Sequence, residues 1–172
     1  MKQDKVIRPR DKGDVPDDPL SRMRHSASHV MADAVKRLRP NAQVAIGPSI
    51  ENGFYYDFDT EPFSPDDIAR IEAEMRKIIA ENVPFNRHVV SRAEALERFR
   101  SRGEKYKVEI IESIPEDEEV SYFQHGDFID LCRGPHVERT GDIKAVKVLS
   151  FAGAYWRCAR RRASTRLRTT AP

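Results

Sequence analysis

Apolar residues recur at steps of three and four along residues 18–38, which is the spacing of one face of a helix. Asp18 and Pro19 supply an N-cap and a first-turn proline, and the sequence Arg39-Pro40-Asn41 ends the segment. We therefore predict a helix over residues 18–38 whose apolar face belongs to the core. That face consists of Leu20, Met23, Ala27, Val30, Met31, Ala34 and Leu38.

Two further segments carry helix signals. Ser64-Pro65-Asp66-Asp67 is a capping sequence, and the apolar positions after it continue with helical spacing to about Glu81. Ser91, with Glu94 three residues later, opens a shorter segment that runs through Phe99. We predict an amphipathic helix over each segment.

The remaining apolar runs are short and typical of strands. Residues 44–46 and 54–58 flank the turn signal Asn52-Gly53, which predicts a hairpin. Strands spaced this closely favour a largely antiparallel sheet with helices packed on it, so the predicted fold class is α+β. The other predicted strands are residues 85–90, 108–111, 120–123, 128–131, 143–151 and 154–156.

The composition is typical of a globular domain with a polar surface. Charged residues make up 34% of the 172 residues, and no apolar run approaches the roughly 18 residues that a membrane span needs. The first residues contain no apolar segment of the kind found in secretory signals, so we expect a cytoplasmic protein that does not bind membranes. Its two cysteines, Cys132 and Cys158, are too few for a disulfide framework.

The charge pattern divides the chain into three parts. Residues 1–17 are polar and punctuated by proline and glycine, which predicts a mobile N-terminal segment, and residues 18–157 form the predicted domain. Residues 158–172 are an Arg-rich tail; the last sixteen residues of the chain carry six arginines and no acid. We consider two explanations: a frameshift or truncation after Arg157, or a basic tail that binds RNA phosphates.

Two pairs of candidate ligands have the same spacing. His25 and His29 are four residues apart on the first helix, on a face roughly 140 to 180° from the apolar stripe, so we expect them to face solvent or a cleft. Cys132 and His136 are also four apart, across the turn Arg133-Gly134-Pro135. Together they offer four ligands of the types that zinc accepts. The alternative is a solvated histidine pair and a cysteine packed in the core.

Several enzyme classes lack their usual signals. A zinc peptidase of the H-E-x-x-H type needs Glu directly after the first histidine, where this chain has Ser26. The chain has no G-x-S-x-G elbow and no P-loop. Imidazoles and a thiol near Asp130, with a lysine nearby, suit water activation and the hydrolysis of an ester or amide.

Five ordered motifs carry a resemblance to a known family. They are RHSASHVMADAVKRL, AIGPSIENGFYYDFD, EKYKVEII, DFIDLCRGPHVERTGDIKAVKV and FAGAYWR. In this order the chain resembles the editing region of bacterial threonyl-tRNA synthetases, which is related to the editing domain of alanyl-tRNA synthetases and to free-standing alanyl-tRNA deacylases. The resemblance extends from about Leu20 to Arg157.

The resemblance implies an α+β domain that removes serine from mischarged threonine tRNA. Serine lacks one methyl group of threonine, and one such contact supports only about 10 to 200-fold discrimination, so a hydrolytic second step is needed. In the family a lysine and a histidine order the attacking water, while an aspartate and the other imidazoles contact the aminoacyl group and the terminal ribose. The matching residues here are His25, His29, Lys107, Asp130, Cys132 and His136.

Some of these residues have simpler interpretations without the resemblance. Lys107 could lie on the charged face of an ordinary strand, and Asp130 could cap a turn. Tyr55 and Tyr56 could stack on a base or ribose, or pack in the hairpin. Arg133 could bind phosphate, or pair with Asp130 or with Asp127.

The resemblance also bears on cofactors and on competing functions. It implies no required cofactor, although zinc could bind at His25, His29, Cys132 and His136. We expect tRNA as the partner, a monomer, and no ATP-dependent ligation, because the motifs for that reaction are absent. Two alternatives remain: a non-catalytic RNA-binding or inert fragment of a synthetase, and a zinc-dependent alanyl-type deacylase that acts in trans.

Overall fold

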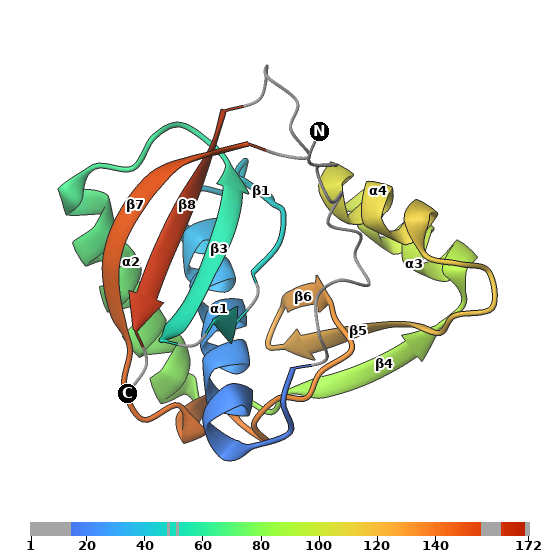
Figure 1. Ribbon diagram of the computed structural model, residues 1–172, viewed down its shortest axis with the longest axis horizontal. Helices are drawn as coiled ribbons and strands as arrows, with labels where there is room; N and C mark the ends of the chain where they lie inside the picture. Colours follow the sequence, from blue (N-terminus) through green and yellow to red (C-terminus); the bar gives the residue numbers. More distant parts are fainter. Residues whose placement is uncertain (1–14, 48, 51, 156–162, 171–172) are drawn as a thin grey trace, which may run out of the picture.

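The predicted α+β class is confirmed in a computed structural model of the chain (Figure 1), which describes residues 15–47, 49–50, 52–155 and 163–170. The described helices are α1 (Pro19–Leu38), α2 (Pro65–Glu81), α3 (Arg92–Ser101), α4 (Lys105–Ser113) and the short 3-10 helix η2 (Thr140–Asp142). The described strands are β1 (Gln43–Val44), β2 (Ser49–Ile50), β3 (Gly53–Asp59), β4 (Asn86–Val90), β5 (Val120–His125), β6 (Phe128–Leu131), β7 (Lys147–Tyr155) and β8 (Ala163–Thr170).

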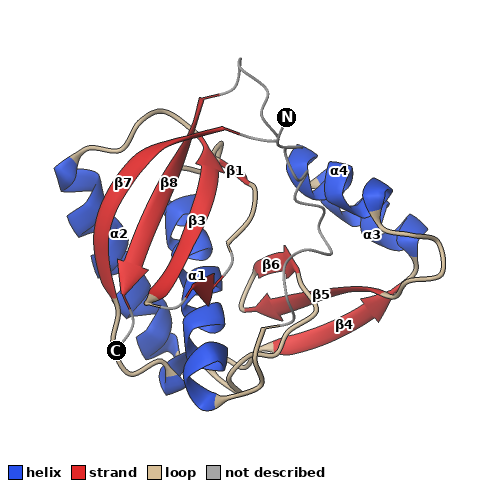
Figure 2. Ribbon diagram, in the orientation of Figure 1, coloured by secondary structure: helices blue, strands red, loops and turns tan. Residues whose placement is uncertain are grey.

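The strands form two antiparallel sheets, with α1 between them (Figures 1 and 2). The larger sheet has the order β1-β3-β8-β7, with β2 also paired to β3, and the smaller has the order β4-β5-β6. Helices α1 and α2 pack on the larger sheet, whereas α3 and α4 pack on each other beside the smaller one. The candidate residues are therefore distributed over two halves of the fold that meet at α1.

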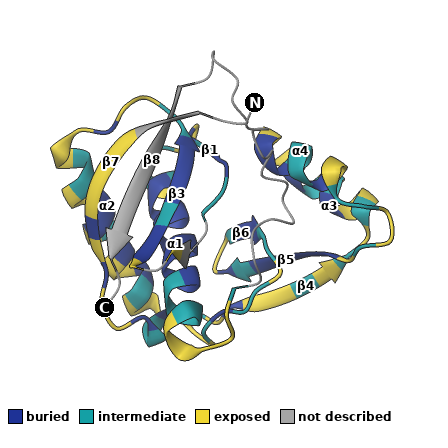
Figure 3. Ribbon diagram, viewed as in Figure 1, coloured by how far each residue is buried: buried dark blue, intermediate teal, exposed yellow. Residues whose placement is uncertain are grey.

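The core is built around α1. Every residue from His25 to Val35 is buried, because the larger sheet and α2 cover the apolar stripe while the smaller sheet covers the opposite face. On β3, Phe54, Tyr56 and Phe58 alternate onto the inner face and are at most 1% exposed. Figure 3 shows β3 buried along its length and β4 and β7 largely exposed. The hairpin thus directs Tyr56 toward α1.

The predicted helix starts are present with their caps. Asp18 Oδ1 accepts hydrogen bonds from the backbone N–H groups of Leu20 and Ser21, both at 3.0 Å. Ser64 and Asp67 form a reciprocal capping box at the start of α2. Ser91 Oγ accepts a hydrogen bond of 3.2 Å from a backbone N–H at the start of α3. These caps satisfy donors that the first turn of a helix leaves unpaired.

The predicted strand over residues 108–111 is wrong, because this segment lies inside α4. Tyr106, Lys107 and Ile111 are its buried residues, a spacing that belongs to a helix face. The Arg92 guanidinium stabilises the end of this helix by donating to the carbonyl oxygens of Ile111, Ile114 and Pro115. A short apolar run could not distinguish the two structures by itself.

Part of the Arg-rich segment belongs to the larger sheet. Residues 163–170 form β8, which pairs with β3 on one side and β7 on the other. Over these residues the segment is therefore not a separate tail, because its main-chain groups complete the hydrogen bonding of two neighbouring strands. The rest of the predicted tail, the end of the predicted strand 154–156 and the first fourteen residues lie outside the described residues.

Within the described part of the chain, no helix is both long enough and apolar enough to cross a membrane. Helix α1 has 20 residues, but histidine, serine and aspartate side chains occupy its central turns. Those polar residues lie at the candidate site.

We expect Ser64→Ala to lower the free energy of unfolding by about 1 kcal/mol, because it removes the side-chain half of the α2 capping box. Ser113→Ala is the matched control, since the Ser113 hydroxyl only donates to the Ile110 carbonyl at the end of α4. Urea unfolding of both variants measures the difference. Equal stabilities of the two variants would contradict the assigned cap.

Candidate active site

The fold brings His25 and His29 of α1 together with Cys132 and His136 from the segment that follows β6. Their candidate ligand atoms all lie within 4.8 Å of one another, and we call these four residues the histidine-thiol cluster. The His25 and His136 rings stack with centroids 4.2 Å apart, and His29 meets both rings edge-on. Residues more than 100 positions apart in the sequence thus form one compact group.

Cys132 lies at the centre of the cluster. Its Sγ is 3.3 Å from Nε2 of His25 and 3.3 Å from Nε2 of His136. The backbone N–H of Gly134 donates to the same sulfur at 3.2 Å. Gly134 has φ +86°, and a Cβ atom there would lie 2.9 Å from the Phe123 ring. Glycine is therefore required for the turn that aims a backbone donor at the thiol.

The three histidines of the cluster are almost fully buried. His29 is 2% exposed, and His25 and His136 are each 8% exposed. The expected solvent-facing or cleft-facing side of α1 is covered by the segment after β6 and by two aromatic side chains. Phe85 stacks on His136 with centroids 4.9 Å apart, and Phe85 and Phe128 both meet His29 edge-on at 6.5 Å.

Burial sets the protonation of His136. Loss of solvent lowers the pKa of His136 well below its usual range, and the neighbouring rings of His29 and His25 lower it further. His136 is therefore neutral at neutral pH and offers a nitrogen lone pair.

A second group of polar residues lies beside the cluster. Lys107 Nζ is 2.5 Å from Asp130 Oδ1, and the Tyr56 hydroxyl donates to Asp130 Oδ2. Lys107 also donates to the Ala45 carbonyl at 2.8 Å and to the Tyr56 hydroxyl at 3.1 Å. Burial, and then the charge and hydrogen bond of Asp130, raise the pKa of Tyr56 well above its usual range, so Tyr56 remains a donor.

His29 connects the two groups, since its Nε2 is 3.7 Å from Asp130 Oδ2. All six candidate residues from the sequence therefore lie in one continuous site. The structure adds Tyr56, whose contact with Asp130 was not predicted. Alternation with Phe54 and Phe58 could have indicated its inward direction, and a buried tyrosine hydroxyl needs a partner.

Arg133 does not pair with either predicted acid; it forms an ion pair with Glu118. Its side chain is 60% exposed and lines an open cleft of about 600 Å³ on the outer side of His136. Arg22 and Arg87 also line this cleft, together with Phe85 and the segment Gly134–Glu138. The cleft brings solvent to the outer face of His136.

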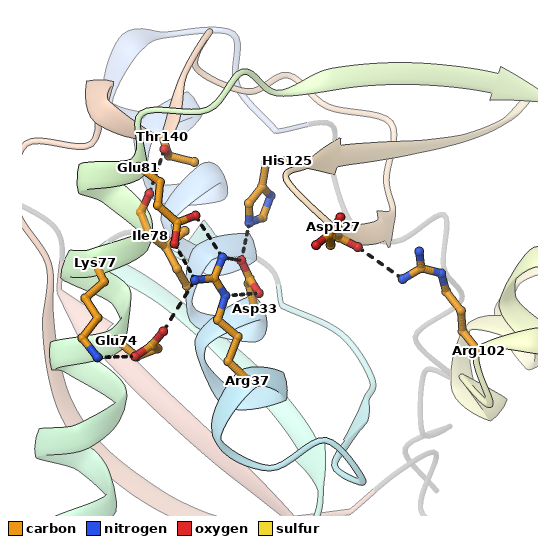
Figure 4. A network of polar contacts seen from close by, with 10 residues as sticks. All are labelled: Asp33, Arg37, Glu74, Lys77, Ile78, Glu81, Arg102, His125, Asp127 and Thr140. Atoms are coloured by element: carbon orange, nitrogen blue, oxygen red, sulfur yellow. Dashed lines mark hydrogen bonds and ion pairs between the residues drawn. The ribbon is translucent and has the colours of Figure 1, made fainter.

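An ionic network between α1, α2 and β5 lies next to the site (Figure 4). Arg37 donates two hydrogen bonds to Asp33, at 3.1 and 3.3 Å, and two to Glu81, at 2.6 and 3.0 Å. Asp33 Oδ2 is also 3.2 Å from Nε2 of the buried His125. The network thereby joins α1, α2 and β5, one helical turn beyond His29.

The histidine-thiol cluster fits zinc with a small adjustment. Ligand atoms around tetrahedral zinc lie about 3.3 to 3.6 Å apart, and the two Sγ to Nε2 distances of 3.3 Å agree with this. The four ligand atoms together lie within 4.8 Å of one another, which is wider than this spacing, so a ligand would have to move by up to about 1 Å. The Nδ1 atoms of His25 and His136 each have an outer oxygen partner at 3.0 Å, as zinc-binding histidines usually do.

Comparison with known proteins shows which class of domain the chain resembles. Residues 120–166 match the family described as the threonyl and alanyl tRNA synthetase second additional domain. The predicted resemblance is confirmed, since over these residues the chain is similar to this family. The matched section contains Asp130, Cys132 and His136, whereas His25, His29 and Lys107 lie outside it.

In particular, the chain is similar to bacterial threonine-tRNA ligases. It is 57% identical over 135 residues to that of Carboxydothermus hydrogenoformans, covering 78% of this chain and 21% of the relative. It is 58% identical over 142 residues to that of Lawsonia intracellularis, covering 82% of this chain and 22% of the relative. The chain therefore spans about a fifth of the length of the curated relatives it matches.

We expect the fold to lose stability as the pH falls below about 6.5, where unfolded histidine gains a proton that buried His136 resists. The contribution is complete above that pH and is lost progressively below it, because only the unfolded state binds the proton. Urea midpoints measured with chelator between pH 7 and 5 should fall less steeply for His136→Gln than for the natural chain. Identical slopes would show that His136 is not held neutral.

Proposed function

We propose that this chain is an editing domain that hydrolyses the ester of seryl-tRNA(Thr). The observation that carries the proposal is the junction between His29 and Asp130, which joins the histidine-thiol cluster to the Lys107–Asp130 pair. Ester hydrolysis needs a base, hydrogen-bond donors for the developing oxyanion, and groups that fix the substrate. The two groups together contain all three.

In the proposed reaction, neutral His136 and Lys107 order a water molecule beside the ester carbonyl carbon. The water oxygen attacks that carbon while His136 accepts its proton, and positive charge on Lys107 stabilises the developing oxyanion. The carbon–oxygen bond to the ribose then breaks, and the ribose oxygen takes the proton. The products are free serine and a tRNA with a restored hydroxyl.

The other site residues have binding roles in this proposal. Asp130 accepts hydrogen bonds from the terminal ribose or the aminoacyl group, with Tyr56 holding the carboxylate in place. His25, His29 and Cys132 contact the aminoacyl group from the opposite side. A closed site of buried residues suits a small side chain such as that of serine, which a hydrolytic second step must separate from threonine.

The arginine-lined cleft supports tRNA as the partner. Arg22, Arg87 and Arg133 are between 42 and 60% exposed, and each already faces an acid that phosphate could replace. In the proposal, phosphates of the acceptor end lie in this cleft while the terminal ester reaches past His136. We propose a cytoplasmic monomer whose editing domain comprises residues 18–157 together with β8.

A second candidate function is a zinc-dependent deacylase of the alanyl type, which the fit of the histidine-thiol cluster to zinc favours. In that case the same four residues would hold the metal, and zinc would supply an activated water. A non-catalytic RNA-binding or inert fragment is the third candidate. ATP-dependent ligation is not part of any of these proposals.

We expect the chain to release serine from seryl-tRNA(Thr) faster than threonine from threonyl-tRNA(Thr), and His136→Gln to lower the rate constant about 100-fold or more, because the variant loses the proposed base. His88→Gln is the matched control. His88 stacks on Tyr122 on the smaller sheet, away from the cluster, and should leave the rate unchanged. Circular dichroism confirms that both variants are folded.

Absence of serine release by the natural chain would rule out the editing proposal, and absence of release from any aminoacyl-tRNA, alanyl-tRNA included, would leave only the non-catalytic candidate. A loss of rate in both variants would instead point to general destabilisation rather than to a role of His136.

We expect serine release to persist after dialysis against a strong chelator, because the proposed base and oxyanion donor are side chains of this chain. The measurement is the rate before and after dialysis, with bound zinc determined by atomic spectroscopy. Loss of activity with the chelator and recovery with added zinc, accompanied by alanine release from alanyl-tRNA, would establish the alanyl-type deacylase instead.

A further inference from the structure

Ser26 lies between the two histidines of α1, and its side chain is fully buried. Its Oγ is 2.8 Å from the Arg22 carbonyl oxygen, 3.0 Å from the Val137 backbone nitrogen and 3.0 Å from Nδ1 of His136. One hydroxyl thus contacts both α1 and the segment that carries His136.

The donor and the acceptor in each of these contacts follow from which atoms carry a hydrogen. The Arg22 carbonyl can only accept, so it takes the single hydroxyl hydrogen, and the Val137 N–H can only donate, so it uses one lone pair of Oγ. The remaining lone pair faces His136 Nδ1 and is satisfied only if that nitrogen carries a hydrogen. The opposite arrangement would leave two oxygens 2.8 Å apart with no hydrogen between them.

We propose that Ser26 is a positioning residue that holds His136 as the Nδ1–H tautomer, with the Nε2 lone pair directed toward Cys132. His25 is held in the same way, because its Nδ1 is 3.0 Å from the Pro135 carbonyl, which can only accept. Two Nε2 lone pairs therefore converge on one sulfur. The catalytic consequence rests on the proposed function.

This arrangement directs the Nε2 lone pair of neutral His136 toward the centre of the cluster. There Cys132 Sγ lies 3.3 Å from it and accepts from the backbone N–H of Gly134. A water molecule that enters the cluster can therefore give a proton to Nε2 of His136. The other tautomer would present an N–H at that position and could not accept the proton.

Ser28 is a matched control on the same helix. It is fully buried like Ser26, and its hydroxyl also donates to a helix carbonyl, that of His25, at 2.7 Å. That is the one hydrogen bond of its side chain found among the described residues, and no histidine ring takes part in it. Removing either hydroxyl costs a similar helix hydrogen bond, whereas only Ser26 contacts an imidazole.

The experiment measures tautomers directly. Two-bond proton–nitrogen correlation spectra of the whole chain with labelled histidine, recorded at neutral pH with chelator, report which nitrogen carries the hydrogen. The His136 signals are assigned by their loss in His136→Gln. We expect the Nδ1–H tautomer in the natural chain, and an Nε2–H pattern at His136 would overturn the proposal without any Ser26 variant.

Variants then test whether the Ser26 hydroxyl sets the tautomer of His136. Ser26→Ala should shift the His136 tautomer ratio toward Nε2–H by about fivefold, the effect of losing one ordinary hydrogen bond. Ser26→Thr, which keeps the hydroxyl, and Ser28→Ala should both retain the natural ratio. An unchanged ratio in folded Ser26→Ala, or the same shift in Ser28→Ala, would refute the role of Ser26.

The kinetics of serine release, measured beside the spectra, distinguish the role of Ser26 from the proposed function. Ser26→Ala should lower kcat for serine release by up to about fivefold, in line with the loss of the competent tautomer, with little change in KM, and Ser26→Thr should restore it. If the natural chain releases no serine, the proposed function fails while the spectra still decide the tautomer. If serine release is present but the tautomer does not respond to Ser26→Ala, the positioning role alone is rejected.

Discussion

The site depends on burying the carboxylate of Asp130. A carboxylate that is 2% exposed must be paired or hydrogen-bonded, because an isolated buried charge costs several kcal/mol. Lys107 from α4 and Tyr56 from β3 meet this requirement, with His29 of α1 at 3.7 Å. Asp130 itself lies on β6, so one charged group requires four elements to approach one another. The two halves of the fold are thereby held in register by the residues proposed to act on substrate.

The histidine-thiol cluster is stabilised in a different way. Cys132 Sγ contacts a backbone N–H and two imidazole nitrogens. Burial and the crowding of like rings keep His136 neutral, while Ser26 and the Pro135 carbonyl occupy the outer nitrogens. The neutral His136 therefore lies near the Lys107–Asp130 ion pair, and His29 contacts both His136 and Asp130. The proposed chemistry uses this difference: lone pairs on one side and positive charge on the other.

Sequence patterns anticipated α1, α2, α3 and the hairpin, since capping residues and turn residues are local signals. The spacing of histidine and cysteine indicated four of the candidate residues, whereas Lys107 came from the family resemblance alone. The segment that follows Lys107 was wrongly predicted to be a strand. Its apolar run fits a strand or a helix, and the choice depends on tertiary partners such as Arg92, which caps the end of α4 from another helix. The burial of His25 and His29 was missed for the same reason. Helical periodicity separates the two faces of α1, but it cannot show that the smaller sheet covers the second face.

The residues of the site are spread along the chain, so the section matched to the synthetase domain family contains only some of them. The section matched to the synthetase domain family supplies Asp130, Cys132 and His136, and each of these depends on a partner outside it. Asp130 needs Lys107 and Tyr56, Cys132 needs His25, and His136 needs Ser26. A change in α1, β3 or α4 can therefore alter the chemistry without touching the matched residues. The function of this domain thus depends on contacts that only the folded chain creates.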